Sequence, residues 1–192
     1  SLDGGQSFLP PVQLVVPGQP PDAMPHDPTI AADGVGVYVA WTYESGNLAD
    51  RPAVYFSRSA DGLTFSAPQQ LSASGAATLD PDLAVGPDGT VYAAWAVWQD
   101  GIHVAASHDL GLTFGPPQKV SGSVAESWHP AIATHAACTG GSSRVGIVWQ
   151  GERILGSSYQ GTDVPGRIWF AQSLDGGAHF GQPVSVDEGP AA

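Results

Sequence analysis

One short phrase occurs four times along this 192-residue chain, and it constrains the fold more than any other feature. The phrase reads Ser-x-Asp-x-Gly-x-x-Phe and begins at Ser1, Ser107 and Ser173. A fourth copy, beginning at Ser59, is one residue shorter between its Asp and its Phe. Internal repeats at a period of about 50 residues are typical of propellers and solenoids, because one such unit cannot bury its apolar face alone.

A second pattern lies between the phrases and predicts strands. Each time, an apolar run that starts at a Pro is followed by a turn and then by a run ending in Trp41, Trp95 or Trp149. These runs are short, rich in β-branched and aromatic residues, and bounded by Gly, Pro, Asp and Ser, which is typical of strands. We expect each Pro to stand at the start of its strand, where a missing N–H is tolerated.

Each repeat is therefore expected to hold four strands, with the repeated phrase as the turn between the third and the fourth. The expected strands are 26–31, 35–41, 53–57 and 69–72; 80–85, 90–95, 101–105 and 118–121; and 129–134, 144–149, 167–171 and 183–186. No stretch has sustained helical periodicity. The predicted fold class is all-β, a β-propeller segment of four-stranded antiparallel blades.

The segment is expected to contain three complete blades and the end of a preceding one. The blades are placed at 21–74, 75–123 and 124–192, and residues 1–20 supply the end of a blade, with a strand near 12–16. Closed propellers use about four to eight blades, and an open set leaves exposed sheet edges. Either the chain is a piece of a longer polypeptide or further copies complete the ring. The surplus strand at 12–16 favours the longer polypeptide.

The repeated phrase resembles the Asp-box, or BNR repeat, of sialidase-like β-propellers, and the resemblance extends over the whole chain. Asp and Ser side chains can bond backbone N–H groups within a turn, Gly accepts positive φ, and the Phe can pack beneath the hairpin. We interpret the motif residues as structural rather than catalytic: Ser1, Asp3, Gly5, Phe8, Ser59, Asp61, Phe65, Ser107, Asp109, Gly111, Phe114, Ser173, Asp175, Gly177 and Phe180.

Charge and composition limit the partners. Eighteen acidic residues against six basic ones give a formal net charge of −12, which argues against nucleic acid and anionic membranes and disfavours acidic sugars. No apolar run is long enough to span a bilayer. Cys138 stands alone, so no disulfide within the chain is expected. Few Lys, Met and Cys residues, together with the resemblance, predict a secreted or cell-surface bacterial protein.

The resemblance implies that a ligand binds at the end of the blades opposite the Asp-boxes. Trp98 and Trp128 belong to that end and break the repeat, because no other blade has an aromatic residue at their positions. Aromatic rings on loops suit stacking on sugar rings, with carboxylates bonding the hydroxyls. The alternative is that they cover the ends of blades. Tyr43 and Tyr159 are weaker candidates of the same kind.

Three polar residues stand near equivalent Pro positions and would ring the mouth of the central channel. They are His26, Asp80 and His129. Such groups could bind a divalent cation if they converged, and the alternative is that each caps its own strand turn. No other cofactor is predicted.

The catalytic set implied by the resemblance is incomplete in this chain. Sialidases of this fold grip the substrate carboxylate with three Arg residues and use a Tyr nucleophile, assisted by Glu, with an Asp acid/base. The Arg-Ile-Pro phrase that carries their first Arg is absent. Arg51, Arg153 and Arg167 fall on the expected ligand side, and Glu152 and Tyr159 could mimic the Glu–Tyr pair. No catalytic residue is therefore assigned.

Three functions remain open from the sequence. The first is an extracellular non-catalytic module that binds glycan or protein through the loops opposite the Asp-boxes. The second is part of a sialidase-like glycoside hydrolase. The third is a structural surface or filament subunit whose blade edges pair between copies.

Overall fold

The computed structural model of the chain describes residues 3–47, 50–73, 75–123, 126–137, 142–152 and 166–187. These residues form strands and no helix. Three four-stranded antiparallel sheets account for all the strands, which confirms the predicted fold class. None of the described residues forms a helix that could cross a membrane.

Each sheet is one blade, with its strands in chain order. Blade 1 contains β1 (Met24–Ala32), β2 (Val37–Glu44), β3 (Ala53–Ser59) and β4 (Gln69–Gln70). Blade 2 contains β5 (Thr78–Val85), β6 (Val91–Val97), β7 (Gly101–Ser107) and β8 (Gln118–Lys119). Blade 3 contains β9 (Glu126–His135), β10 (Arg144–Glu152), β11 (Arg167–Ser173) and β12 (Val184–Ser185).

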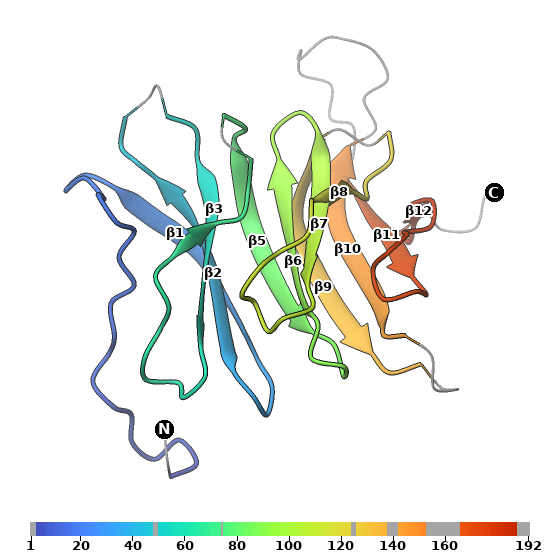
Figure 1. The fold of residues 1–192 in the computed structure, drawn as a ribbon. Helices are drawn as coiled ribbons and strands as arrows, with labels where there is room; N and C mark the ends of the chain where they lie inside the picture. The colour runs from blue at the N-terminus through green and yellow to red at the C-terminus, as the bar shows by residue number, and fades with distance from the viewer. Residues whose placement is uncertain are drawn as a thin grey trace.

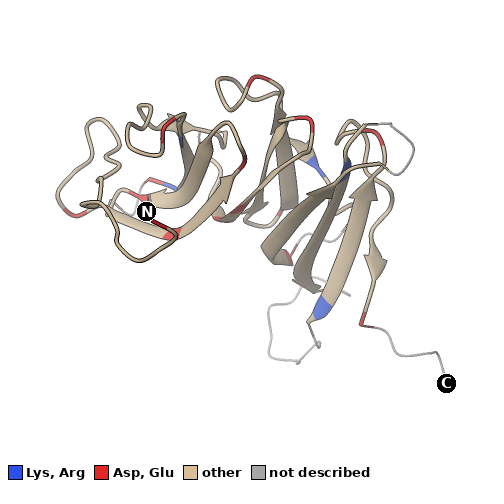
Figure 2. Ribbon diagram, turned by 90° about the horizontal axis from the view of Figure 1, so that it is seen from below, with Lys and Arg blue, Asp and Glu red and all other residues tan. Residues whose placement is uncertain are grey.

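The blades stand side by side, and their first strands lie innermost. Figure 1 shows the sheets in the order blade 1, blade 2 and blade 3 from left to right, and Figure 2 shows them fanning out when viewed from below. The first strand of blade 2, β5, contacts both β1 and β9. The inner strands therefore line one common wall, and the short fourth strands lie at the periphery.

The core consists of two layers of side chains between neighbouring blades. Trp95 of blade 2 is buried in a cluster with Val54 and Phe56 of blade 1. Trp149 of blade 3 is buried in a second cluster with Ile102 and Val104 of blade 2. Because burial of one large apolar side chain contributes about 3 kcal/mol, these repeated Trp residues are main contributors to the contact between blades.

The Pro residues of the first strands lie within the strands, and not at their starts as the sequence suggested. Pro28, Pro81 and Pro130 each lie at a break in the pairing register between the first and second strands of a blade. A β-bulge leaves one residue of the ladder unpaired, so a Pro without an N–H is accommodated there. Simple alternation of apolar and polar residues cannot reveal this extra residue.

The strand expected at residues 12–16 is not formed. Residues 9–16 belong to none of the three sheets, although Val16 is buried and Leu14 lies beside Trp41 at the edge of a small cavity. A strand needs a hydrogen-bonded neighbour, and none of the described sheets offers this segment one. The segment instead lies in extended form against blade 1 (Figure 1).

Candidate ligand-binding face

The two ends of the blades carry different connections. Figure 1 shows the turns between the third and fourth strands at the lower end, which we call the Asp-box end. The connections from second to third strands, including residues 45–47, 50–52 and 98–100, lie at the opposite end, which we call the loop end. The expected separation of the Asp-boxes from the candidate ligand-binding loops is therefore present in the structure.

Trp98 and Trp128 meet at the loop end. Trp98 lies between β6 and β7 of blade 2, Trp128 lies in β9 of blade 3, and their ring centroids are 5.1 Å apart in an edge-to-face arrangement. The Trp98 backbone N–H donates to the Ala77 carbonyl at 2.9 Å, which anchors the loop to the start of blade 2. Trp98 is 44% exposed, whereas Trp128 is half-buried against the core.

The structure partly supports both interpretations of these two residues, ligand stacking and coverage of the blade ends. Trp128 packs on the apolar layer between blades 2 and 3, as a residue that covers a blade end does. Trp98 presents nearly half of its surface to solvent beside it. The result is an aromatic surface built by two blades, with one anchored ring and one accessible ring.

A carboxylate lies two residues from the accessible ring. Asp100 accepts hydrogen bonds from Lys119 Nζ at 2.9 Å and from His103 Nε2 at 2.7 Å. The hydrogen bond from Lys119, with a smaller contribution from His103, holds the pKa of Asp100 below its ordinary value. No local sequence pattern predicts this network, because its three members come from the loop, β7 and β8.

The inner strands carry a strained polar residue at each bulge. Asp27, Asp80 and His129 have φ values of 50°, 52° and 49°, and each directly precedes a Pro. The residue before a Pro normally prefers extended backbone, so these left-handed conformations are unfavourable by themselves and persist only where their surroundings hold them. The bulge thus sets a polar side chain at the same place in all three blades.

Asp80 joins blades 2 and 3 at this level. Its carboxylate Oδ2 accepts a hydrogen bond from the His129 backbone N–H at 3.2 Å and lies 3.2 Å from His129 Nδ1. His26, the third candidate of this group, lies 2.7 Å from Asp27 and 3.8 Å from Glu44 instead. Two of the three candidate cation ligands therefore meet. Within the described parts of the chain, no three His, Cys, Asp or Glu side chains gather as metal ligands would.

Asp82, two residues further along β5, holds all three blades together. Its Oδ1 accepts a hydrogen bond from Thr29 Oγ1 of blade 1 at 2.9 Å. Its Oδ2 accepts one from the Ile132 backbone N–H of blade 3 at 2.8 Å. A carboxylate engaged on both sides in this way stabilises the packing of the inner strands, so the sequence Asp80-Pro81-Asp82 is more than a turn signal.

Tyr43 lies on the far side of blade 1 from this site. Together with Tyr55, Asp22 and Asp50 it lines an open groove of about 430 Å³. Partial burial, followed by the phenol of Tyr55 and the carboxylates of Asp22 and Asp50, raises the pKa of Tyr43. Arg51 is exposed just before β3. Neither residue lies in the Trp98–Trp128 surface.

The residues that could imitate a sialidase site are only partly described. Arg167 begins β11 and pairs with Gly151 of β10. Glu152 ends β10, but its side chain, together with Arg153 and Tyr159, lies outside the described residues. Ser1 and Cys138 also lie outside them. The Glu–Tyr pair suggested by the sequence therefore stays a prediction.

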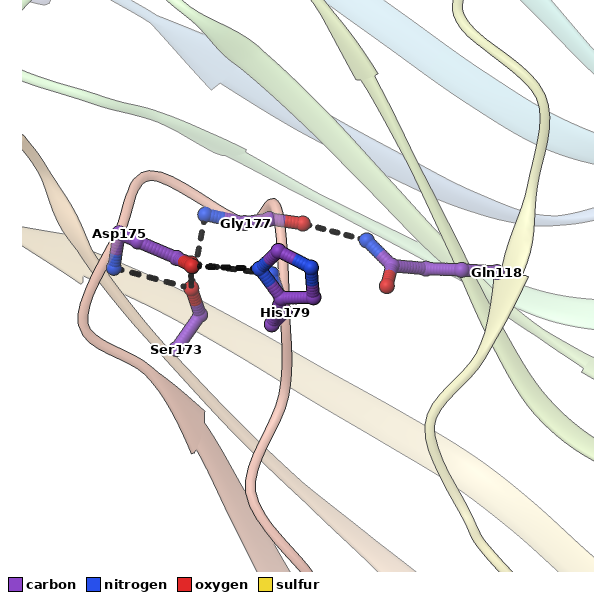
Figure 3. Close-up of polar contacts among 5 residues, drawn as sticks. All are labelled: Gln118, Ser173, Asp175, Gly177 and His179. Carbon is purple, nitrogen blue, oxygen red and sulfur yellow. Dashed lines mark hydrogen bonds and ion pairs between the residues drawn. The ribbon is translucent and has the colours of Figure 1, made fainter.

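At the Asp-box end, each Asp organises its own turn. In the third turn (Ser107–Phe114), Asp109 accepts hydrogen bonds from Ser107 Oγ, from the Thr113 backbone N–H and from Thr113 Oγ1 at 2.6–2.8 Å. Figure 3 shows the same arrangement around Asp175, with His179 in place of Thr113. The first turn has the equivalent bonds from Ser7 to Asp3.

These hydrogen bonds favour the ionised form of the carboxylates. The bonds from Thr113 and Ser107 lower the pKa of Asp109 to about 2. The backbone N–H groups of Thr64 and Leu63, with Ser59, lower the pKa of Asp61 to about 2. Bonds from Ser173 and His179 also lower the pKa of Asp175. Each acid is therefore ionised and bonded within its own turn, which leaves it unsuited to act as a proton donor.

The turns of blades 2 and 3 also accept hydrogen bonds from the preceding blade, a contact that the repeated phrase does not predict by itself. Gln69 of blade 1 donates to the Gly111 carbonyl at 3.0 Å, and Gln118 of blade 2 donates to the Gly177 carbonyl in the same way (Figure 3). Neighbouring carbonyls of these turns accept from Arg58 Nη1 at 3.2 Å and from the Tyr92 hydroxyl at 3.0 Å. The sequence does contain a signal for these contacts, because a Gln stands four residues after both Phe65 and Phe114.

The Phe residues of the motif differ in burial. Phe114 packs edge-to-face on Phe56 of blade 1 at 4.9 Å, and Phe180 packs on the layer between blades 2 and 3. Phe65 is half-buried. Phe8 is 81% exposed, because no blade lies beneath the first turn among the described residues.

Known structures resemble this fold at low sequence identity. A GH43 endo-arabinanase from Bacillus licheniformis matches with a TM-score of 0.52 at 13% identity, over 86% of this chain and 60% of the enzyme. A xylan β-1,4-xylosidase from Bacillus halodurans C-125 matches with a TM-score of 0.54 at 14% identity, over 88% of this chain and 31% of the enzyme. An endo-arabinase from Bacteroides thetaiotaomicron VPI-5482 gives a TM-score of 0.50 at 16% identity, over 84% and 60%.

These likenesses establish the fold as that of β-propeller blades. This chain spans 31% to 60% of the length of the three structures. No protein-family model matches it, and no curated protein does. The sialidase-like resemblance of the repeated phrase therefore stays a prediction, whereas the propeller architecture that it implied is confirmed.

Proposed function

We propose that this protein is a non-catalytic propeller module that binds a glycan at its loop end. The observation that carries the proposal is the Trp98–Trp128 pair, which combines an exposed ring with an anchored one across the junction of blades 2 and 3. Sugar rings present flat apolar faces that pack on such side chains, and their hydroxyls need acceptors close by. Asp100 is an ionised acceptor in the same loop.

Charge and structural likeness guide the choice of glycan. The formal net charge of −12 disfavours an acidic sugar, because the approach of an anion is opposed by the field of the whole chain. Figure 2 shows Asp and Glu spread over many loops, with few Lys or Arg among them. The similar structures include enzymes named for arabinan and xylan, so these polymers are the first ligands to test. A protein ligand is the alternative partner.

We further propose that the protein acts outside the cell or at its surface. The acidic composition and the scarcity of Lys, Met and Cys support this location. A polymeric glycan would be met there rather than in the cytoplasm. Fractionation of the native source organism tests the location directly.

Affinity electrophoresis in gels that contain arabinan or xylan tests the binding proposal. We expect retardation of the full chain by at least one of these polymers, and about 10-fold weaker binding by Trp98→Ala, equivalent to about 1.4 kcal/mol. Phe8→Ala is the matched control, because Phe8 is an exposed aromatic at the opposite end. Retardation that is equal for Trp98→Ala and the wild type would refute the proposed site.

A glycoside hydrolase is the second candidate. It is supported by the enzymes among the similar structures and by Asp27 and Asp80, which stand at equivalent bulges of neighbouring inner strands. Most glycosidases act through two carboxyl groups. Release of reducing sugar from arabinan or xylan, lost in both Asp27→Asn and Asp80→Asn, would favour the hydrolase. No release by the full chain would count against it.

A further inference from the structure

The junction of blades 2 and 3 carries a second pair of side chains, further along the inner strands than Trp98 and Trp128. The pair consists of Asp80 in β5 and His129 in β9, two strands that contact each other. Trp128 directly precedes His129, and the Trp98 backbone is bonded to Ala77, three residues before Asp80. At about 3.3 Å per residue, the step from Ala77 to Asp80 is about 10 Å. One chain-like ligand can therefore reach both pairs.

Asp80 holds His129 by both its backbone and its ring. The carboxylate Oδ2 accepts a hydrogen bond from the His129 backbone N–H at 3.2 Å and lies 3.2 Å from the ring Nδ1. An unprotonated Nδ1 would turn its lone pair toward this anion, so the carboxylate favours the tautomer with the proton on Nδ1. The neutral ring then offers Nε2 as a hydrogen-bond acceptor.

The base of His129 is fixed, whereas its tip is accessible. Its side chain is 72% exposed, against 16% for Asp80. Within the described parts of the chain, Nε2 has no hydrogen-bond partner. The backbone is held at φ 49° by the bulge between β9 and β10, so the bulge sets the direction in which the ring leaves the strand. An ordered base with an accessible acceptor is suited to contact with a ligand.

His26 of blade 1 shows a different arrangement. Its Nδ1 lies 2.7 Å from Asp27 and its Nε2 lies 3.8 Å from Glu44, so carboxylates face both ring nitrogens. At the bulge itself, blade 1 has Asp27 where blade 3 has His129. Blade 3 thus departs from the repeat by placing a His at the bulge, with a carboxylate at one ring nitrogen only. This departure falls in the same junction as the exposed aromatic pair.

We propose that the glycan bound at Trp98 and Trp128 extends along the inner strands to His129, whose Nε2 accepts a hydrogen bond from a sugar hydroxyl. Asp80 is a positioning residue, which sets the proton and the orientation of the ring. The inference rests on the proposed glycan binding and describes its ligand more closely. The ligand is a neutral oligosaccharide of two or more units, because Nε2 and Asp100 both require O–H donors and one sugar ring cannot reach both pairs.

Affinity electrophoresis of the full chain, in arabinan and in xylan, tests this extension. We expect His129→Ala to bind about 5-fold more weakly through loss of one hydrogen bond, and Asp80→Asn about 3-fold more weakly. The double variant should bind no more weakly than His129→Ala alone, because Asp80 acts through the ring. His135→Ala is the matched control and should bind like the wild type, since His135 is an exposed His at the other end of β9.

Nitrogen-15 NMR of the imidazole rings reads the position of the proton directly. Assignment through the backbone identifies the His129 ring, so the measurement on the wild type does not depend on the folding of any variant. We expect the proton on Nδ1, and a shift of the Nε2 signal when arabino- or xylo-oligosaccharides are added. Asp80→Asn should increase the share of the tautomer with the proton on Nε2. Circular dichroism should find all variants folded.

The outcomes separate this extension from the proposed function. A wild-type chain that neither polymer retards, or Trp98→Ala that binds like the wild type, overturns both. Weaker binding by Trp98→Ala together with wild-type affinity in His129→Ala overturns the extension alone. A double variant that is weaker than His129→Ala by the whole Asp80→Asn factor, or a wild-type ring with its proton on Nε2, overturns the role of Asp80.

Discussion

Both ends of the blades carry short connections between strands, but the connections at the Asp-box end stabilise the fold, whereas those at the loop end vary between blades. At the Asp-box end, the turns repeat, and their carboxylates accept hydrogen bonds from within the turn. The turns of blades 2 and 3 also accept hydrogen bonds from the preceding blade. At the loop end, the connections differ from blade to blade, and Trp98 stands exposed beside Trp128. A repeated, self-satisfied turn stabilises the fold, whereas a connection that departs from the repeat is free to bind a ligand.

Acid should produce the largest effect at the Asp-box end, because it acts on all the turns at once. The pKa values of Asp61 and Asp109 lie at about 2 in the folded chain against 3.8 ordinarily. A lowered folded-state pKa stabilises the fold above the ordinary value, and this stabilisation is lost as the pH falls toward the folded value. Urea unfolding from about pH 5 to about pH 2 should therefore show a steep loss below about pH 4.

Asp109→Asn should make the free energy of unfolding depend less on pH, because the variant lacks one of the titrating carboxyl groups of the turns. Its stability at neutral pH should be lower than that of the wild type. A wild-type urea midpoint that stays constant between about pH 4 and about pH 2 would contradict the role assigned to the carboxylates.

Gly111→Ala should cost more than any other single change at this end. Gly111 has φ +78°, and an added Cβ would lie 2.7 Å from the Phe56 ring of blade 1. Backbone strain and the clash together should lower the free energy of unfolding by about 3 kcal/mol. Gly5→Ala is the matched control, since Gly5 has φ +90° and no atom within 4 Å of the added Cβ. It should cost about 1 kcal/mol, and equal losses would show that the third turn is not packed against blade 1.

Gln69→Ala tests the hydrogen bond between blades 1 and 2 separately from the conformation of the turn itself. It removes the hydrogen bond to the Gly111 carbonyl and should lower the free energy of unfolding by about 1 kcal/mol. Gln13→Ala, at an exposed position before blade 1, should change it by less than about 0.5 kcal/mol. Urea denaturation of the two variants under one set of conditions distinguishes these values.

Leu110→Gly should have the smallest effect, and in the opposite direction. Leu110 has φ 60°, where the first and fourth turns have Gly4 and Gly176. Relief of this strain should exceed the extra chain entropy of Gly in the unfolded state by about 0.5 kcal/mol. A thermal melt with a raised midpoint supports the account, and a lowered midpoint would mean that the Leu110 side chain contributes packing.

The sequence predicted the repeat but not the contacts between repeats. Trp95 and Trp149 were identifiable as core residues because they recur at the ends of equivalent strands. Trp98 and Trp128 were identifiable because they break the pattern, yet their meeting depends on how blade 2 sits against blade 3. Gln118 and Gly177 are 59 residues apart, and no local periodicity reports such a bond.

The strained bulges were missed for a different reason. A strand pattern of period two describes side-chain alternation, and the extra residue at Asp27, Asp80 or His129 disturbs it only locally. The alternation of side chains therefore predicts Pro28 and its equivalents at strand starts. The recurrence of the Pro is visible in the sequence, which is why Asp80 and His129 are candidates for the same site.

The most direct test of this account measures both affinity and stability for two variants, Trp98→Ala and Gly111→Ala. Affinity for the retained polymer and the free energy of unfolding are determined on the same preparations. We predict that Trp98→Ala binds about 10-fold more weakly while losing less than about 1.5 kcal/mol of stability. Gly111→Ala should bind like the wild type while losing about 3 kcal/mol. Wild-type affinity in Trp98→Ala would contradict the assignment of ligand binding to the loop end.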